Sequence, residues 1–309
     1  MWSYFVQRLL QAVPVLLGVA LISFGLTELS GDPVRGLLGQ STRPEIVAKV
    51  KEFYGYDRPA PERFARYLWR LARGDLGASI SNHGLPVTHL LLDGLKVTVK
   101  LALGAMIVAV ALGLLSGIVS AWRPRSVLDY ASSGLAAAGI SFPAFFLAML
   151  FLMLFAVRLK WFPVGGYEEG RLEYLILPSL SLGLIMTASV SRLSRNCLLE
   201  TLSQDYVRTA RAKGLAPWRV LLGHALPNAL VPVVTVIGND FAGLLCGAVL
   251  TETVYGLPGI GSALNRAIFE RDLPVVMGAC LVMAVIFVVA NLLVDLTYAA
   301  LDPRIRYAE

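Results

Sequence analysis

Charged residues are scarce in this sequence, at 16% of 309 residues, whereas a soluble domain typically carries about 25%. Hydrophobic residues make up 56% and are gathered in long blocks, which excludes an ordinary soluble globular domain. A helix needs about 20 apolar residues to cross the roughly 30 Å hydrocarbon core of a bilayer. Several blocks reach that length and are continuously apolar, unlike the alternating strands of a membrane barrel. The sequence therefore predicts an all-α polytopic membrane bundle.

Metal ligands and nucleotide-binding motifs are scarce as well. The three cysteines have no C-x-x-C spacing, which argues against a disulfide framework or a zinc site. The three histidines, His83, His89 and His224, form no ligand cluster along the chain, so we expect no metal and no cofactor on this chain. No G-x-x-x-x-G-K-[ST] motif is present, and any ATP chemistry must therefore come from another subunit.

About six spans are expected. They cover roughly residues 9–29, 97–122, 131–157, 174–191, 230–254 and 275–300. The third is interrupted by Phe142-Pro143, and proline removes a backbone donor and bends or unwinds a helix. We expect one transmembrane domain over residues 1–309, with residues 31–96 as an extramembrane insertion within it.

The basic residues of the short loops predict the orientation. With six spans, Arg8, the turn at Arg123 and Arg125, the stretch 192–227 and the C-terminal arginines fall on one side. That side is predicted to be cytoplasmic, with both termini inside. The insertion is predicted to lie outside although it holds many basic residues, because long loops translocate largely regardless of charge. The net charge of +6 thus indicates topology rather than nucleic-acid binding.

The stretch 192–227 is too polar to span a membrane. Its segment from Asp205 to Gly214 predicts a short helix ended by a glycine cap. A second helix is expected to begin at Ala216-Pro217, where proline is tolerated in the first turn. Two helices meeting at a glycine would present a knob with an apolar face and a basic rim, suited to a socket on a partner protein. The alternative is an amphipathic connector that lies on an anionic leaflet.

The spacing of residues in this stretch resembles that of the cytoplasmic loop of bacterial ABC importer permeases. The pattern of that loop is E-A-A, three residues, Gly, nine residues and then I-x-L-P. Arg208-Thr209-Ala210 occupies the first positions and His224-Ala225-Leu226-Pro227 the last, with Gly214 between them. Arg208 and His224 depart from the pattern. The sequence of residues 206–214 is similar to that found in the dipeptide, oligopeptide and nickel branch of the family.

Further motifs extend this resemblance over the whole chain. They are Gly31-Asp32-Pro33, Ile140-Ser141-Phe142-Pro143, Pro258-Gly259-Ile260-Gly261 and Leu301-Asp302-Pro303-Arg304. The resemblance implies a type I permease in the bacterial cytoplasmic (inner) membrane. It also implies a second related permease, two ATPase subunits that bind ATP and Mg, and an extracytoplasmic solute-binding protein as partners.

Two sets of candidate site residues follow. The resemblance makes 192–227 the loop that couples the chain to an ATPase, carried by Arg208, Thr209, Ala210, Arg211, Lys213, Gly214, Trp218, Leu226 and Pro227. Charges inside spans are costly and broken helices often line transport paths. The expected translocation path therefore involves Asp240, Glu252, Phe142, Pro143 and Phe145.

Peptides are the first substrate class that the branch implies, with nickel or a metal chelate second. Two functions of other classes remain open. An ion-driven transporter would usually show inverted repeats, and an intramembrane enzyme would need a convergent catalytic set, which Asp240 alone does not supply. We predict a transport subunit that is not itself an enzyme.

Overall fold

The computed structural model describes residues 2–29, 43–54, 57–82 and 84–301, which are helical apart from turns and one isolated bridge between Ala78 and Pro86. This confirms the all-α class. The α-helices are α1 (Trp2–Leu29), α3 (Pro44–Tyr54), α4 (Ala60–Ala72), α5 (Val87–Trp122), α6 (Val127–Ser141), α7 (Ala144–Phe151), α8 (Glu173–Leu202), α9 (Asp205–Ala212), α10 (Pro217–Val220), α11 (Leu226–Leu245), α12 (Val249–Tyr255), α13 (Ile260–Glu270) and α14 (Leu273–Leu301). Two π-helical segments are η1 (Leu152–Arg158) and η2 (Leu221–Ala225). The Gly31-Asp32-Pro33 motif, His83 and most of the Leu301–Arg304 motif lie outside the described residues.

Five helices among the described residues are long and apolar enough to cross a membrane. They are Leu10–Leu29, Val87–Trp122, Glu173–Leu202, Pro217–Leu245 and Leu273–Thr297. The third expected span is not among these five helices, because it is divided at Phe142-Pro143 into α6 and the apolar segment Ala144–Arg158. Phe142 is extended, at φ −89° and ψ 129°, because the proline ring disfavours a helical conformation in the residue before it. The predicted break is confirmed.

The bundle is built around the pair α5 and α8. Small residues let these two helices approach closely: a Cβ atom at Gly113 would stand 2.7 Å from the Val190 side chain, and one at Gly183 would stand 2.6 Å from the Ala105 carbonyl oxygen. Such contacts are typical of membrane helix pairs, where close backbone packing replaces the hydrophobic effect. Helices α6 and α11 pack on α8, and α14 packs on α11 and α1.

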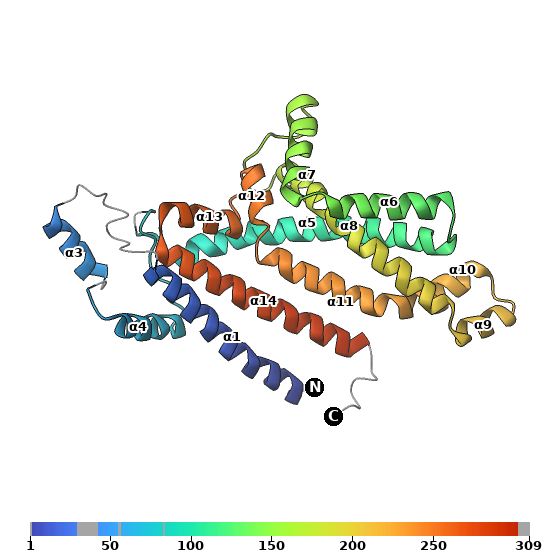
Figure 1. Cartoon of the computed structure of the whole chain (residues 1–309), viewed down its shortest axis with the longest axis horizontal. Coiled ribbons are helices and arrows are strands. Elements are labelled where there is room, and N and C mark those ends of the chain that lie inside the picture. Colours follow the sequence, from blue (N-terminus) through green and yellow to red (C-terminus); the bar gives the residue numbers. More distant parts are fainter. Residues whose placement is uncertain (1, 30–42, 55–56, 83, 302–309) are drawn as a thin grey trace.

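The elements divide between two ends of the bundle (Figure 1). Helices α9 and α10 lie at one end, together with the turn between α5 and α6. Helices α3, α4 and α13 lie at the opposite end. Helices α1 and α14 pack against each other and are joined by an ion pair of 3.0 Å between Arg8 and Asp295. Segment α7–η1 projects away from the other helices.

Three element boundaries differ from the prediction. Helix α5 begins at Val87, so the last residues of the expected 31–96 insertion belong to the helix of the second span. Span five ends at Leu245, since Gly247 turns the chain at φ +102° and a separate helix, α12, follows. The stretch between the fifth and sixth expected spans, which holds the Pro258–Gly261 motif, contains α13, an eleven-residue helix that the span prediction did not include.

Candidate functional sites

Helix α9 and the start of the helix that follows form a compact projection, here called the knob (residues 205–225). Gly214 connects its two arms with φ +78°, in the left-handed region that glycine adopts without penalty. Its N–H donates to the Arg211 carbonyl at 3.0 Å. Pro217 stands in the first turn of α10, where its missing N–H costs little. The predicted helix–glycine–helix segment is confirmed.

The arms of the knob are not equivalent. Helix α8 continues through Leu202, so the first part of the expected 192–227 loop extends the fourth span. The second arm runs from Pro217 through η2 directly into α11, and the whole segment Pro217–Leu245 is one span-length helix. A displacement of the knob is therefore a displacement of the end of a span.

The inner face of the knob is apolar and buried. Val207 and Ala210 of α9 contact Val220 and Leu221 of the second arm, and all four are at most 5% exposed. They form one cluster with Ala121 of α5 and with Leu198, Ala225 and Ala229. Burying such side chains contributes roughly 1.5–3 kcal/mol for each valine or leucine. The cluster thus fixes α9 against the ends of α5 and α8.

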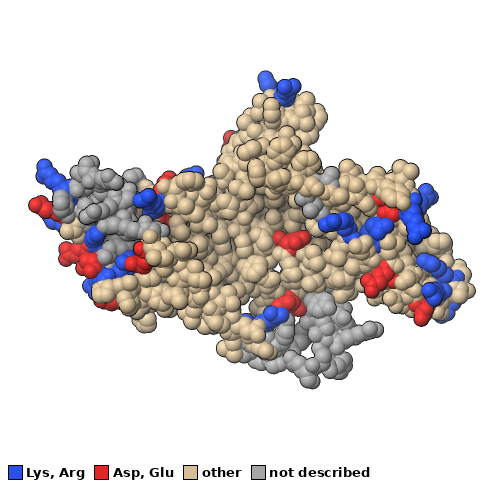
Figure 2. All heavy atoms as spheres, viewed as in Figure 1, with Lys and Arg blue, Asp and Glu red and all other residues tan. Residues whose placement is uncertain are grey.

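The outer face combines exposed apolar side chains with basic residues. Trp218 and Leu222 are 54% and 49% exposed, one turn apart. Leu221, between them in the chain, instead belongs to the buried cluster and is 4% exposed. The exposed basic and polar residues named by the prediction are Arg208, Thr209, Arg211 and Lys213, and Arg219 is exposed as well. Pro227 is also exposed, and Leu226 beside it is half-buried. Figure 2 shows Lys and Arg gathered at this end.

An ion-pair network that the sequence reasoning missed lies at the base of the knob. The Arg195 guanidinium donates to both carboxylate oxygens of Asp129, from Nε at 2.7 Å and from Nη2 at 2.9 Å. Ser120 also donates to Asp129, and the Arg125 N–H donates to it at 2.8 Å. Asp129, which precedes the third apolar stretch, is 3% exposed. The Arg195 hydrogen bonds, with those of Ser120 and Arg125, hold the pKa of Asp129 well below its usual range. The network joins α5, α6 and α8.

The residues expected on the translocation path do not form one cluster. Phe142 and Phe145 are 47% and 39% exposed, and Phe142 stacks on Phe146 at a ring distance of 6.0 Å. Asp240 is half-buried on α11 and has no ion-pair partner among the described residues. Helix α11 packs on α5, α8 and α14, whereas α7 packs on α8 and α12.

Glu252 has a definite structural environment on α12. It is fully buried, accepts a hydrogen bond from Thr98 Oγ1 at 2.7 Å and another from the Ser262 N–H at 2.8 Å. Its carboxylate thus lies against the first turn of α13, where negative charge is favourable. A Cβ atom at Gly259 or Gly261 would lie within about 3 Å of this carboxylate, which explains the glycines of the Pro258–Gly261 motif. Glu252 fastens α13 to α5 and α12.

No group of three or more metal-ligating side chains occurs within the described ranges. Together, a helical membrane bundle and a compact knob at its basic end define the membrane subunit of a multi-subunit transporter. The chain belongs to the family described as "binding-protein-dependent transport system inner membrane component", whose profile matches residues 109–307. It is therefore an inner-membrane transport permease and not itself an enzyme.

Curated relatives match almost the full length of the chain. The dipeptide transport system permease protein DppB of Alkalihalophilus pseudofirmus is 38% identical, covering 99% of this chain and 100% of the relative. The oligopeptide transport system permease protein OppB of Escherichia coli is 36% identical with the same coverage. Among solved structures, the MetNI methionine ABC transporter in inward-facing form matches with a TM-score of 0.58 and 20% identity, over 69% of this chain and 96% of that chain. This likeness supports the type I permease fold.

Proposed function

We propose that this chain is one of two related permeases that form the pore of an ATP-driven importer of short peptides. Full-length similarity to permeases named for dipeptides, di- and tripeptides and oligopeptides supports this substrate class. Nickel, the second candidate from the sequence, is not favoured, because these relatives carry peptide names. The ATPase subunits, with ATP and Mg, and the solute-binding protein would be separate chains.

The knob is proposed to dock into a groove of an ATPase subunit on the cytoplasmic side. The observation that carries this proposal is that Trp218 and Leu222 are exposed although the inner face of the knob is fully packed. A well-packed element that still exposes an aromatic ring is typical of a protein contact, because tryptophan and arginine dominate interface energies. Arg208, Arg211 and Lys213 would form the polar rim of that contact.

The opposite end, with α3, α4 and α13, is proposed to face the extracytoplasmic side and the binding protein. Asp240 is proposed to lie on the translocation path, because a half-buried carboxylate inside a span is functional by default. The exposed rings of Phe142 and Phe145, beside the break at Pro143, are proposed to line the same path between the two permeases. Glu252 would support this path by fixing α12 and α13.

The knob proposal is tested with Trp218→Ala in the complex co-expressed with the second permease and the ATPase subunits. Trp161→Ala is the matched control, since Trp161 is 66% exposed but lies after η1, away from the knob. We expect Trp218→Ala to lower ATPase co-purification and peptide-stimulated ATP hydrolysis at least about tenfold, as an interface hot spot does. Trp161→Ala should leave both unchanged.

Equal ATPase recovery in the two variants would refute docking through the knob. If Trp218→Ala instead lowered only the binding of the knob to anionic vesicles, the leaflet-bound connector would be the correct interpretation. Peptide uptake by the wild-type complex in proteoliposomes tests the substrate class separately, with labelled dialanine as the solute and a nickel salt as the competing candidate.

A further inference from the structure

Helix α4 is strongly amphipathic. Positions three and four apart gather its apolar side chains on one side, and these are Phe64, Ala65, Tyr67, Leu68, Leu71 and Ala72. The opposite side carries the charged residues, which are Glu62, Arg63, Arg66, Arg70 and, at the end of the helix, Arg73. Trp69 lies on the border between the two sides. No residue of α4 is fully buried, so the bundle covers its apolar side only in part.

One edge of this apolar side packs on the end of a membrane span. The ring of Phe64 contacts the ring of Phe24 of α1, with centroids 5.2 Å apart. Arg63 forms an ion pair of 2.7 Å with Glu28 of the same helix. The span ends at Leu29, so at 1.5 Å per residue these contacts lie within about 8 Å of its end. Helix α4 therefore lies at the depth where the hydrocarbon of a bilayer meets the headgroups.

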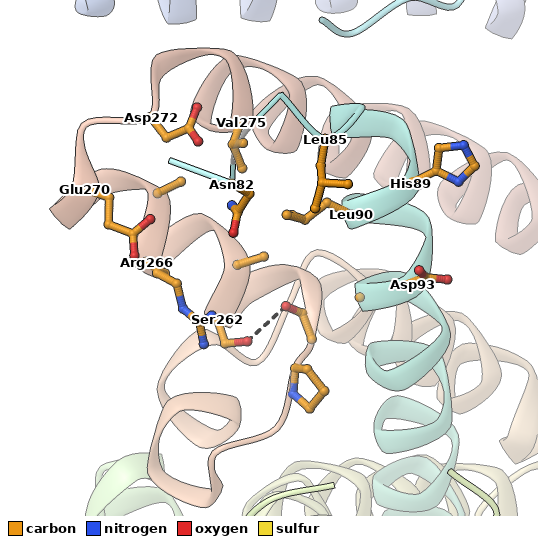
Figure 3. Close-up of a pocket in the computed structure, with 15 residues that line it drawn as sticks. Asn82, Leu85, His89, Leu90, Asp93, Ser262, Arg266, Glu270, Asp272 and Val275 are labelled. Carbon is orange, nitrogen blue, oxygen red and sulfur yellow. Dashed lines mark hydrogen bonds between the residues drawn. The ribbon is translucent and has the colours of Figure 1, made fainter. Parts of the chain in front are cut away.

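The chain that follows α4 is fixed to the start of a second span. Asp272, just before α14, accepts a hydrogen bond from Ser79 Oγ at 2.5 Å. The N–H groups of Ile80 and Ser81 donate to the same carboxylate oxygen at 3.1 and 3.0 Å. These contacts stand beside a pocket of about 360 Å³ between α13 and the first turns of α5 and α14, where Figure 3 shows Asp272 and Asn82. The position of α4 is thus determined by α1 and by the loop after α4.

The other edge of the apolar side of α4 is exposed. Ala65 and Ala72 are exposed, and Trp69 beside them is 61% exposed. Beneath the contact with α4, on the same face of α1 as Phe24, Leu17 and Leu21 are 48% and 56% exposed. Helix α1 lies at the edge of the bundle (Figure 1), so lipid acyl chains cover this face in a bilayer. The exposed edge of α4 continues the same lipid-facing surface toward the headgroups.

The charged side of α4 complements anionic headgroups. Glu62 is shared by two cations, Arg58 at 2.5 Å and Arg66 at 3.1 Å. Arg73 pairs with no carboxylate in the described part of the chain, and its guanidinium lies over the ring of Trp69 at 4.6 Å from the centroid. Guanidinium groups with unused N–H donors suit phosphate oxygens. Tryptophan and basic residues on such a helix are typical of the membrane–water interface.

We propose that α4 is a lipid-binding helix that lies in the headgroup region of one leaflet and binds anionic phospholipid. Ala65, Ala72 and the ring of Trp69 contact the upper parts of the acyl chains, and Arg66 and Arg73 contact the phosphates. In the orientation proposed above this is the outer leaflet. The lipid contact itself requires only that α1 spans the membrane, and it is independent of the transported solute.

The depth of α4 is tested in the full permease–ATPase complex, in nanodiscs of phosphatidylcholine with a minority of phosphatidylglycerol. A trace of phospholipid carries a photoreactive diazirine, either just below the headgroup or at the end of the acyl chain, and mass spectrometry locates the labelled peptides. We expect the upper probe to label residues 60–73 together with the end of α1. The chain-end probe should label the middle of α1 and leave α4 unlabelled.

The headgroup preference is measured with upper probes on the two phospholipids. Arg73→Gln should lower the ratio of phosphatidylglycerol to phosphatidylcholine label on α4 about fivefold, which corresponds to ~1 kcal/mol for one basic residue at an anionic surface. Arg171→Gln is the matched control, because Arg171 is exposed but pairs with Glu168 at 2.8 Å in the loop before α8. It should leave the ratio unchanged.

Three results would overturn the proposal. Absence of label from α4 in a complex whose α1 is labelled would show that lipid does not reach this helix. Label that disappears when the solute-binding protein is added, or that is found only in the permease without its partner subunits, would assign the exposed edge to a protein contact. An equal headgroup ratio in wild type and Arg73→Gln would refute the recognition of anionic lipid.

Discussion

Substitution of Gly214 is the most direct test of the proposed role of the knob, because it changes the backbone conformation without adding a side-chain contact. The φ angle of +78° costs a residue with a Cβ atom about 1–2 kcal/mol. A Cβ atom at Gly214 would meet no heavy atom within 4 Å, so no steric clash adds to this cost. A penalty of that size changes the ratio of native to displaced arrangements about 5- to 30-fold.

The type of residue should therefore matter more than its volume. Gly214→Asn is expected to stay near wild type, since asparagine tolerates the left-handed region. Gly214→Ala should lose part of the coupling, and Gly214→Val most of it, because a β-branched residue with positive φ is a true outlier. The assays are ATPase co-purification and peptide-stimulated ATP hydrolysis in reconstituted membranes.

Gly170→Val is the matched control. Gly170 has φ +85°, and a Cβ atom there would also meet nothing within 4 Å, but it lies in the loop before α8. It should lower stability to a similar extent and leave coupling intact. If Gly214→Val coupled at the wild-type level, or if Gly214→Asn lost coupling more than Gly214→Ala, the conformational reasoning would be wrong.

Three further predictions concern charge and orientation. Asp129→Asn should destabilise the complex by about 3 kcal/mol, because removing one partner of a buried pair leaves Arg195 uncompensated. Asp205 is exposed, so Asp205→Asn should have no measurable effect. Thermal unfolding measures both variants. Because the pKa of Asp129 is lowered in the folded state, its contribution is complete above about pH 4 and should be lost as the pH falls below that value. Asp240→Asn should impair peptide uptake in an assembled complex, and unchanged uptake kinetics would make Asp240 structural. A reporter fused near Pro61 should be exposed outside the cell, and a cytoplasmic signal there would reverse the orientation.

Much of this protein is determined by local sequence. Runs of about 20 apolar residues define the spans by length alone, because hydrocarbon leaves the backbone no alternative to a helix. Pro143 ends α6 and Gly214 turns the chain within the knob. Both effects are properties of a single residue, so they can be predicted from the sequence without knowing which residues lie nearby in the fold. The basic residues of the short loops likewise predict which end is cytoplasmic.

Tertiary structure alone decided the features that depend on residues far apart in the chain. Asp129 meets Arg195 across 66 positions, and Glu252 meets Thr98 across 154, so no sequence window contains either pair. Leu221 is buried and Trp218 exposed because α9 packs against the side of the second arm that carries Leu221. The pocket at Asp272 arises because the loop after α4 folds back onto the start of α14. The length of the apolar runs specifies which helices span the membrane, but contacts between distant residues decide how each charged group is paired.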